Sequence, residues 1–497
     1  MKNNSKKADR IQAPPKFAIK FANTVFVLGL LFSVFVFSFY VYRLYKIWTA
    51  FNPDGYIYAG YSDQELYKYY LKSLITGGIS ATLFGLGLRL KNSLKVNLSV
   101  LFATVGTSVY AFETYLELQA QIVPRQQMAK KMGVPYDTRT KFEVFEDLWK
   151  DSVEAYPKHS SSKEFSETNG LITNEGRIFP IGGISRVPTI GDNESGYYPI
   201  MTIDEYGFNN PIGLYNKDAV DIVLTGDSFT EGYSVHSDET ISAVLRKSGF
   251  YAISVGKSGS GPLIELAALK EYAEPLKPKI VLWLYCTNDI KDLYRELNSS
   301  LLRKYLYEDG FSQNLISRQD EIDSVLINYV RPKWDRERKI EKIKNHWTIR
   351  VFKLTNFRTR INLTPKPKPE PKPEPKPEHE PEHEPEHGEV LKNILEQSKK
   401  LVSGWEGRMY FVYLPSFHRY SIGNEHINRD FVLGTATKLG IPVIDIHTEV
   451  FAPHPDPLSL FPYRMEGHYN AEGYRLVAEA IGKRLKGDGF IPSNSNN

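Results

Sequence analysis

The chain has 497 residues, and its 62 lysines and arginines against 58 aspartates and glutamates give a formal net charge of +4. So small an imbalance gives no support for a nucleic-acid partner. With 41% hydrophobic and 13% aromatic residues, the chain can bury a full core, which excludes a wholly disordered protein. The single cysteine, Cys286, excludes an intramolecular disulfide and a cysteine-based zinc or iron–sulfur site.

Three apolar runs predict a membrane domain over residues 1–117. Residues 21–42 carry no charge and are long enough to cross a bilayer as a helix, and the run is longer than the apolar region of a signal peptide. Residues 71–88 and 96–112 predict a helical hairpin. They are rich in glycine, serine and threonine, as helix contacts in membranes are. A buried hairpin of a soluble domain is the alternative interpretation of these two runs.

Basic residues around these runs predict their orientation. Lysines and an arginine precede the first run, and Arg89, Lys91 and Lys95 lie between the second and third. The positive-inside rule places both segments in the cytoplasm. Three crossings then put the chain after residue 117 on the periplasmic or extracytoplasmic side. We therefore expect a multi-pass cell-membrane protein with a cytoplasmic N-terminus.

Residues 118–218 are polar and rich in turn residues, which is typical of a connecting region of short strands and loops. From 219 to 490, apolar runs of strand length alternate with amphipathic helical stretches. This alternation predicts a three-layer α/β/α sandwich around a parallel sheet. The five predicted strands are 221–224, 251–255, 280–285, 409–414 and 442–446.

An insertion separates the third of these strands from the fourth. Residues 293–363 are predicted to be mostly helical, and 331–360 hold eleven lysines and arginines against three acidic residues. Such a surface suits anionic head groups or an acidic polysaccharide, but we favour the interpretation that it is an ordinary solvated helix face. Residues 364–388 form a proline-rich linker, because proline at alternate positions forbids helix. Its histidines, His379, His383 and His387, have no fixed geometry there, so we expect no specific metal site.

Four short motifs follow the ends of predicted elements. The first strand leads into TGDSFTEG, which puts Ser228 at the start of a helix, and the second leads into VGKSGSGP, whose glycines expose backbone N–H groups. The third leads into CTNDIKDL, where the Asn288 amide can donate to an oxyanion. In GHYNAEG, His468 precedes a helix and can act as a general base. Each motif alone is also explained by an ordinary turn, cap or structural histidine.

Together, in this order along one sheet, the four motifs resemble the SGNH (GDSL) hydrolase family, over roughly residues 219–486. The resemblance implies that Ser228 is the nucleophile and His468 its base. It also implies an oxyanion hole built from the N–H groups of Ser228 and Gly259 and the amide of Asn288. No cofactor and no metal are implied.

The sequence departs from the family pattern at two positions. Cys286 stands where block three usually has glycine, and we interpret it as a small buried residue. Met465 stands three residues before His468, where block five usually has the aspartate of the triad. Glu466, Asp456 or a backbone carbonyl are the candidates left open to hold the imidazole.

A segment upstream of the serine, GFNNP at residues 207–211, resembles SGNH proteins that act on envelope polysaccharides. We therefore expect a membrane-anchored esterase or O-acyltransferase that acts on O-acyl groups, above all O-acetyl groups, of a cell-envelope or extracellular glycan. A transferase would need a polytopic membrane partner to supply the acyl group. The alternatives are a non-catalytic glycan-binding or scaffold protein with the same fold, and a lipid esterase.

Overall fold

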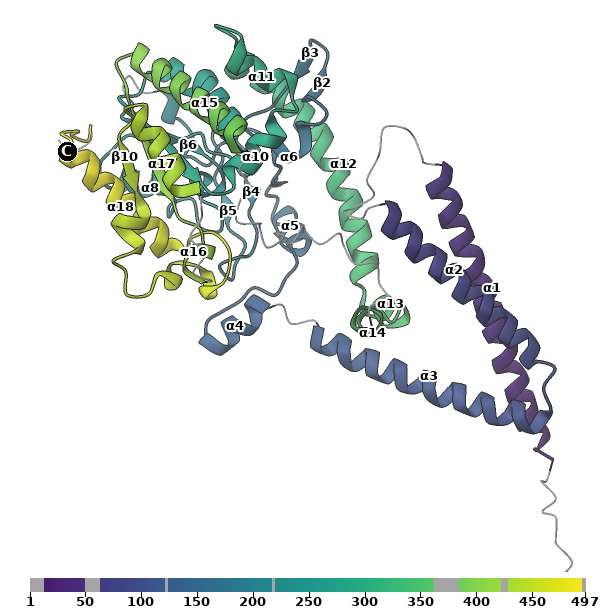
Figure 1. Cartoon of the computed structure of the whole chain (residues 1–497). Coiled ribbons are helices and arrows are strands. Elements are labelled where there is room, and N and C mark those ends of the chain that lie inside the picture. The colour runs from purple at the N-terminus through teal and green to yellow at the C-terminus, as the bar shows by residue number, and fades with distance from the viewer. Residues whose placement is uncertain are drawn as a thin grey trace, which may run out of the picture. The chain divides into compact units, whose positions relative to one another are not determined.

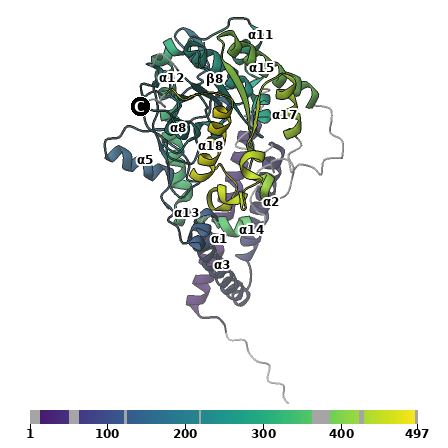
Figure 2. The same cartoon turned by 90° about the vertical axis from the view of Figure 1, so that its left-hand side faces the viewer.

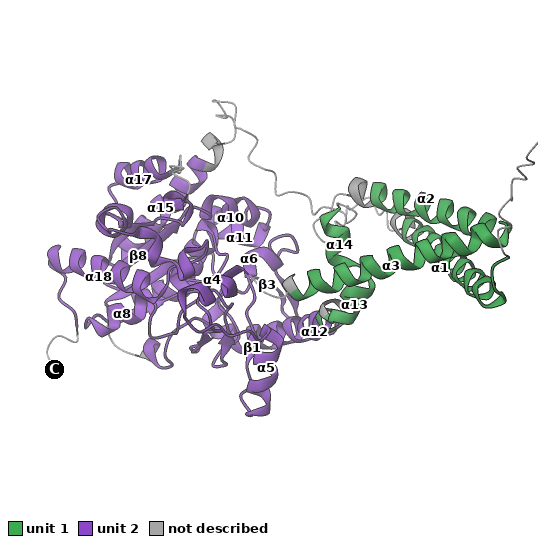
Figure 3. Cartoon of the chain, turned by 90° about the horizontal axis from the view of Figure 1, so that it is seen from below, with its two compact units in different colours: residues 1–122, 340–379 green, residues 123–339, 380–497 purple. Residues whose placement is uncertain are grey.

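The computed structural model describes residues 13–49, 63–120, 124–216, 220–361, 384–421 and 428–493. The chain divides into two compact units, shown in different colours in Figure 3. Unit 1 comprises residues 1–122 and 340–379, and unit 2 comprises residues 123–339 and 380–497. The chain therefore passes between the units three times, and the insertion predicted over 293–363 is shared between them.

Unit 1 contains three long helices, α1 (Lys16–Thr49), α2 (Asp63–Gly87) and α3 (Asn92–Ala120). The helices α1 and α2 lie side by side and antiparallel (Figure 1). Glycines make this close approach possible, because a methyl group on Gly29 would meet the Phe84 ring at 2.4 Å and one on Gly87 would meet the Phe26 ring at 2.1 Å. The small residues of α2 therefore serve its packing on α1, whereas the sequence led us to expect a hairpin of residues 71–88 with residues 96–112.

Two of the described helices are long and apolar enough to cross a membrane, over Lys16–Tyr45 and Asn92–Leu118. The third predicted span, residues 71–88, is helical as part of α2 but does not reach that apolarity. Its glycines, serines and threonines, which allow the packing on α1, also lower its mean hydropathy. Length and composition thus support two spans instead of the three that we predicted.

Two short helices of the insertion, α13 (Trp347–Phe352) and α14 (Thr355–Arg360), pack on α3 within unit 1. Glu113 of α3 accepts hydrogen bonds from the backbone N–H groups of Asn356 and Phe357 at 2.9 and 2.6 Å. These two donors lie in the first turn of α14 and have no partner inside that helix. The Glu113 carboxylate therefore caps α14 from α3.

Unit 2 is built on a five-stranded sheet in the order β10-β9-β8-β6-β7, in which every pair of neighbours is parallel. The fold is therefore mixed α/β with a parallel sheet, as predicted. The strand order is the doubly wound one in which the first strand lies between the second and third. The strands are β6 (Ile222–Gly226), β7 (Ala252–Ser254), β8 (Ile280–Cys286), β9 (Arg408–Leu414) and β10 (Val443–Asp445).

Both faces of the sheet are covered by helices, because successive strand residues point to opposite faces and are apolar on both. Leu282 and Leu284 belong to the core shared with α8 (Ile241–Lys247) and α18 (Ala471–Gly487), which lie side by side in Figures 1 and 2. Trp283 and Tyr285 belong to the opposite core, with α9 (Pro262–Ala268) and α15 (Glu384–Gly404). Continuous apolar strands are what a sheet buried on both faces requires.

The segment between β8 and β9 is mostly helical where it is described, apart from connections such as residues 308–314. It contains α10 (Asp289–Glu296), α11 (Ser300–Tyr307), α12 (Gln319–Asn345), α13 and α14. The helix α15 begins at Glu384, inside the tract that we predicted to be an extended linker over 364–388. Residues 362–383, with His379 and His383, lie outside the described residues.

The polar region before the sheet belongs to unit 2 from residue 123 onward and folds into short elements. Its strands form a three-stranded sheet in the order β1-β4-β5 and a separate β2-β3 hairpin. Phe165, Phe179 and Phe208 are fully buried there and belong to the same core as Trp283 of β8. The connecting region predicted over 118–218 is thus packed against the parallel sheet. The elements are α4 (Pro124–Met132), α5 (Lys141–Lys150), β1 (Tyr156–Pro157), α6 (Ser161–Phe165), β2 (Leu171–Thr173), β3 (Gly176–Ile178), β4 (Thr189–Ile190) and β5 (Ile200–Met201).

Candidate active site

Ser228 stands at the sharp turn between β6 and α7 (Ser228–Glu231). Asp227 caps this short helix, since its side chain accepts a hydrogen bond from the N–H of Phe229 at 2.9 Å. The loops after β6 and β8 leave the carboxyl edge of the sheet where the strand order reverses. Open α/β sheets keep their ligand sites at this switch point. Ser228 therefore occupies the position at which this fold offers a reactive side chain.

His468 and Glu194 complete a line of hydrogen bonds from the serine. His468 Nε2 lies 2.7 Å from Ser228 Oγ, and His468 Nδ1 lies 3.1 Å from Glu194 Oε2. The same carboxylate oxygen accepts from the backbone N–H of His468 at 2.9 Å. His468 lies in the loop before α18, three residues ahead of its first residue Ala471, and Glu194 lies in the loop between β4 and β5. A serine, a histidine and a carboxylate in this order form the arrangement of a catalytic triad.

Glu194 remains ionised over the ordinary pH range. Burial alone would raise the pKa of its carboxyl group, but the hydrogen bonds and charge of His468, together with the charge of Arg125, outweigh burial and lower the pKa to about 2. The guanidinium of Arg125 lies 4.0 Å from Glu194. A carboxylate held in this way fixes the imidazole with its proton on Nδ1, which leaves Nε2 free to accept a proton from the serine.

The structure places both carboxylates considered from the sequence away from the imidazole. Glu466 is 70% exposed and bonds to Nε2 of His418 at 3.0 Å, while its backbone carbonyl accepts from Arg125. Asp456 forms an ion pair with Arg464. The expectation that one of them, or a backbone carbonyl, holds His468 is corrected by the structure, because Glu194 occupies that position from another segment of the chain.

Gly259 and Asn288 line the same pocket as Ser228 and His468. Gly259 has a φ of +75°, which favours glycine. Within the described part of the chain, the N–H groups of Ser228 and Gly259 have no hydrogen-bond acceptor. The Asn288 amide donates to Asp227 at 3.0 Å and to Asp292 at 3.1 Å. Two backbone N–H groups are thus available to a ligand. The Asn288 amide can donate to the same ligand only after it breaks its hydrogen bond to Asp227 or to Asp292.

A buried carboxylate supports the loop of Gly259 from behind. Glu231 accepts a hydrogen bond from the N–H of Ser258 at 3.0 Å, and it pairs with Lys158 at 2.5 Å and with Lys257 at 3.2 Å. Burial would raise the pKa of Glu231, but the two ammonium groups and the hydrogen bonds lower it well below its usual range. Glu231 therefore ties the helix of Ser228 to the loop of Gly259.

The GFNNP segment supports the same elements from the connecting region. The Asn210 side chain accepts from the N–H of Ser254 at 3.0 Å and donates to the Ser254 carbonyl at 2.8 Å, which extends the pairing at the edge strand β7. Asn209 donates to the carbonyl of Glu231 at 2.8 Å. Both asparagines are buried. This segment therefore fixes the positions of the loops after β6 and β7.

Aromatic and basic groups surround the imidazole. The ring centroid of Tyr233 lies 4.4 Å from that of His468, and the ammonium group of Lys158 lies 3.8 Å from the centroid of Tyr233. Burial lowers the pKa of Lys158 to about 8, although the charge of Glu231 opposes this change. The Tyr233 ring therefore covers one side of His468, and Lys158 packs on Tyr233.

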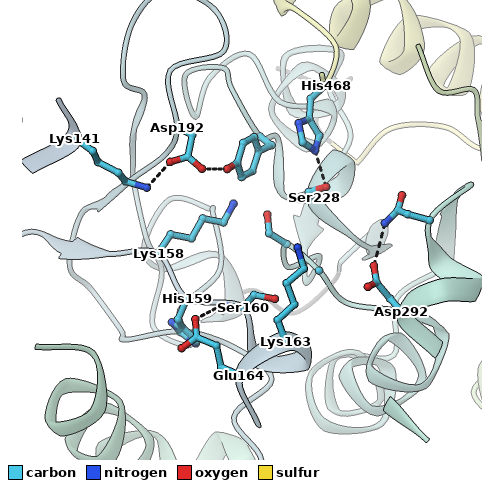
Figure 4. A pocket seen from close by; sticks show the side chains of 14 residues that line it. Lys141, Lys158, His159, Ser160, Lys163, Glu164, Asp192, Ser228, Asp292 and His468 are labelled. Atoms are coloured by element: carbon cyan, nitrogen blue, oxygen red, sulfur yellow. Dashed lines mark hydrogen bonds and ion pairs between the residues drawn. The ribbon is translucent and has the colours of Figure 1, made fainter. Parts of the chain in front are cut away.

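The pocket in front of Ser228 has a volume of about 300 Å³. Figure 4 shows Ser228 and His468 on one side of it, and the side chains of Lys158 and Lys163 extending toward its centre. No aliphatic side chain is among the described residues that line it. Among the described residues, no group of three or more histidines, cysteines, aspartates or glutamates is arranged to hold a metal ion.

Comparison with known proteins adds little beyond the geometry. No protein-family model matches the sequence, and no curated protein matches it. Similar solved structures include two proteins described as lipolytic members of the G-D-S-L family. The one from Desulfitobacterium hafniense DCB-2 is 13% identical, over 53% of this chain and 98% of that chain, with a TM-score of 0.29. The one from Veillonella parvula DSM 2008 is 14% identical, over 54% of this chain and 99% of that chain, with a TM-score of 0.30.

Proposed function

We propose that the protein is a serine ester hydrolase or O-acyltransferase that works through an acyl-enzyme at Ser228. The observation that carries this proposal is the hydrogen-bonded line from Ser228 through His468 to the ionised Glu194. Ser228 Oγ attacks the ester carbonyl carbon while His468 Nε2 takes the hydroxyl proton. His468 then returns the proton to the leaving alcohol as the acyl–oxygen bond breaks. In the second step water or a sugar hydroxyl attacks the acyl carbonyl carbon as His468 takes its proton, and His468 returns that proton to Ser228 Oγ as the acyl–serine bond breaks.

The negative charge that develops on the carbonyl oxygen is bound by the N–H groups of Ser228 and Gly259. The Asn288 amide is the third donor, after it exchanges its hydrogen bond to Asp292 for one to the oxyanion. Lysine, serine and carboxylate side chains surround this point. Such a lining suits a short acyl group on a polar alcohol, and supports O-acetyl groups of a glycan as the substrate over the long acyl chains of lipids.

The membrane part supports an anchored enzyme. Besides α1 and α3, α2 runs antiparallel to α1 along its apolar length, from Tyr69 beside Tyr40 to Gly87 beside Phe26. On this packing we propose that α2 crosses the bilayer beside α1, as a third span that its apolarity alone does not indicate. With the basic α2–α3 loop in the cytoplasm, unit 2 then belongs to the extracytoplasmic space, where envelope and extracellular polysaccharides lie. For a transferase, a polytopic partner would deliver the acyl group there.

The alternative of a non-catalytic glycan-binding or scaffold protein depended on an incomplete triad. Glu194 in hydrogen-bond contact with His468 removes that support. The alternative of a lipid esterase has less support, because no aliphatic side chain lines the described pocket to bind a long acyl chain.

Covalent labelling tests the proposal. The full-length protein, purified in detergent, is treated with a fluorophosphonate probe, and the modified peptide is identified by mass spectrometry. We expect labelling at Ser228 that is lost in Ser228→Ala and strongly reduced in His468→Ala. A neighbouring serine outside the triad, in the variant Ser234→Ala, serves as the control. An intact, folded protein that takes up no label at Ser228 would refute the proposal.

A further inference from the structure

The charges around the pocket are compensated, with one exception. The ammonium group of Lys141 pairs with Asp192 at 2.7 Å, and that of Lys158 pairs with Glu231 at 2.5 Å. The two remaining carboxylates are also paired: Glu164 with Lys333 at 2.9 Å and Asp292 with Arg295 at 2.6 Å. Lys163 is different, because within the described part of the chain it forms no ion pair and no hydrogen bond through its side chain.

This uncompensated ammonium group lies beside the glycine loop of the site. A methyl group placed on Gly259 would come within 3.7 Å of Lys163 Cε. Figure 4 shows the Lys163 side chain reaching from α6 into the pocket, toward the side that faces Ser228. Lys163 is an exposed residue of α6, so its ammonium group is accessible to a ligand that enters the pocket.

A second unsatisfied group lies at the same place. The hydroxyl oxygen of Ser160 is buried without a hydrogen-bond partner, and a methyl group on Gly259 would come 2.4 Å from it. Buried hydroxyl groups normally have a partner, and leaving one without a partner costs stability. Ser160 and Lys163 thus place a hydroxyl donor and an ammonium group beside the same glycine, and neither has an acceptor within the described part of the chain.

We infer that the substrate carries an anionic oxygen group, a carboxylate or a phosphate, close to the ester, and that Lys163 and Ser160 bind it. This inference rests on the proposed function and names the class of substrate, which is an acylated acidic glycan. The anionic group accepts a hydrogen bond from the Ser160 hydroxyl and forms an ion pair with Lys163. The ester carbonyl then lies between Ser228 and Gly259. Lys163 is a specificity residue in this proposal, because it binds the anionic group equally in the bound substrate and in the transition state.

Matched esters test this inference on the full-length protein in detergent. The three esters are the O-acetylated methyl glycosides of glucose, glucuronate and glucose 6-phosphate, which differ only in the group at carbon 6. We expect kcat/KM to be higher for at least one anionic ester than for the neutral one, and the anionic ester that is preferred identifies carboxylate or phosphate as the natural group. In Lys163→Met, the ratio of anionic to neutral kcat/KM should fall by roughly 10- to 100-fold.

Three further variants sharpen the result. Lys163→Arg keeps the charge and should restore most of the preference, and Ser160→Ala should lower it in part. Lys247→Met removes a lysine of α8 that lies outside the pocket and should leave the ratio as it is. An equal loss on the neutral and anionic esters in Lys163→Met would overturn the inference, because the lysine would then act on the oxyanion.

A binding measurement separates this inference from the proposed function. In the Ser228→Ala background, ligand-observed NMR compares methyl glucuronide and methyl glucose 6-phosphate with methyl glucoside. Binding of an anionic glycoside that Lys163→Met abolishes supports the anion site even for a protein that hydrolyses nothing. Equal binding of all three glycosides overturns the site, whatever the esterase assay shows.

Discussion

Glu194 holds His468 through two hydrogen bonds to one carboxylate oxygen, from the ring Nδ1 at 3.1 Å and from the backbone N–H at 2.9 Å. The first bond orients the imidazole, and the second fixes the loop from which the imidazole projects. The acid comes from the connecting region, which lies before the parallel sheet in the chain. A fragment beginning at the first predicted strand would therefore contain the serine and the histidine without their acid.

Replacing Glu194 by glutamine should lower kcat by about 10³- to 10⁴-fold, with little change in KM. The amide keeps the shape and can still accept from the backbone of His468, but it does not stabilise the imidazolium and it permits the wrong tautomer. Initial-rate kinetics with a short-chain ester measures the loss. Glu466→Gln is the matched control, since its side chain faces His418, and it should retain activity within about twofold. A large loss of activity in Glu466→Gln with little loss in Glu194→Gln would show that Glu466 is the acid of the triad.

Asn288→Ala should lower kcat by about 100-fold and change KM little, because the amide binds charge that exists only in the transition state. Asn298→Ala, close to the end of the same helix α10 and outside the pocket, is the control. Steady-state kinetics on both variants, with circular dichroism to verify folding, makes the comparison. Full activity of Asn288→Ala would mean that the amide stays bound to Asp227 and Asp292 throughout the reaction.

The low pKa of Glu194 predicts how stability depends on pH. The carboxyl group has an ordinary pKa of 4.5 when unfolded and a pKa of about 2 when folded. Its contribution is therefore complete above pH 4.5 and is lost as the pH falls toward 2, an interval that corresponds to about 3 kcal/mol. Thermal unfolding of the full-length protein between pH 6 and 3 should show a smaller fall in Tm for Glu194→Gln than for the natural protein. Parallel curves would contradict the low pKa.

Gly207 of the GFNNP segment is predicted to be a position that only glycine can occupy. Its φ is +85°, and a methyl group there would meet the backbone nitrogen of Gly183 at 2.0 Å. We expect Gly207→Ala to lower the free energy of unfolding by about 3 kcal/mol. Gly487→Ala is the control, because a methyl group at the end of α18 meets nothing within 4 Å, and it should change stability by less than about 0.5 kcal/mol. Equal melting temperatures would show that the turn adapts.

The five strands of the parallel sheet were predictable because each is a continuous apolar run between turn residues. The parallel arrangement then brings the ends of β6, β7 and β8 to one edge, so that Ser228, Gly259 and Asn288 lie near one another. The point at which a helix begins was harder to predict, because tertiary contacts decide it. The helix α15, for example, starts within the proline-rich tract at Glu384, a few residues before the apolar stretch that packs on the sheet.

Glu194 could not be predicted in the same way. It lies in a loop between two strands of two residues each, which are too short to show any alternation of apolar and polar residues. Nothing near Glu194 in the sequence distinguishes it from the other acidic residues of the connecting region. The sequence neighbourhood of His468 was misleading, because Glu466 is near in the chain but its side chain projects toward solvent. An acid that approaches from 274 residues away has no local signature.

The interruption of the sheet has a consequence for biosynthesis. The strands β8 and β9 pair along their whole length, from Ile280 opposite Arg408 to Cys286 opposite Leu414, yet the chain visits unit 1 between them. As the protein is made, Ser228 and β8 emerge early, and the apolar edge of β8 stays unpaired until more than a hundred residues have followed. Unpaired apolar edges of this kind are prone to aggregate, and pairing over such a separation is slow. The nascent chain therefore exposes this edge for a long time, and His468 follows Ser228 only after 240 residues, so that a product that stops before residue 468 lacks the base of the triad.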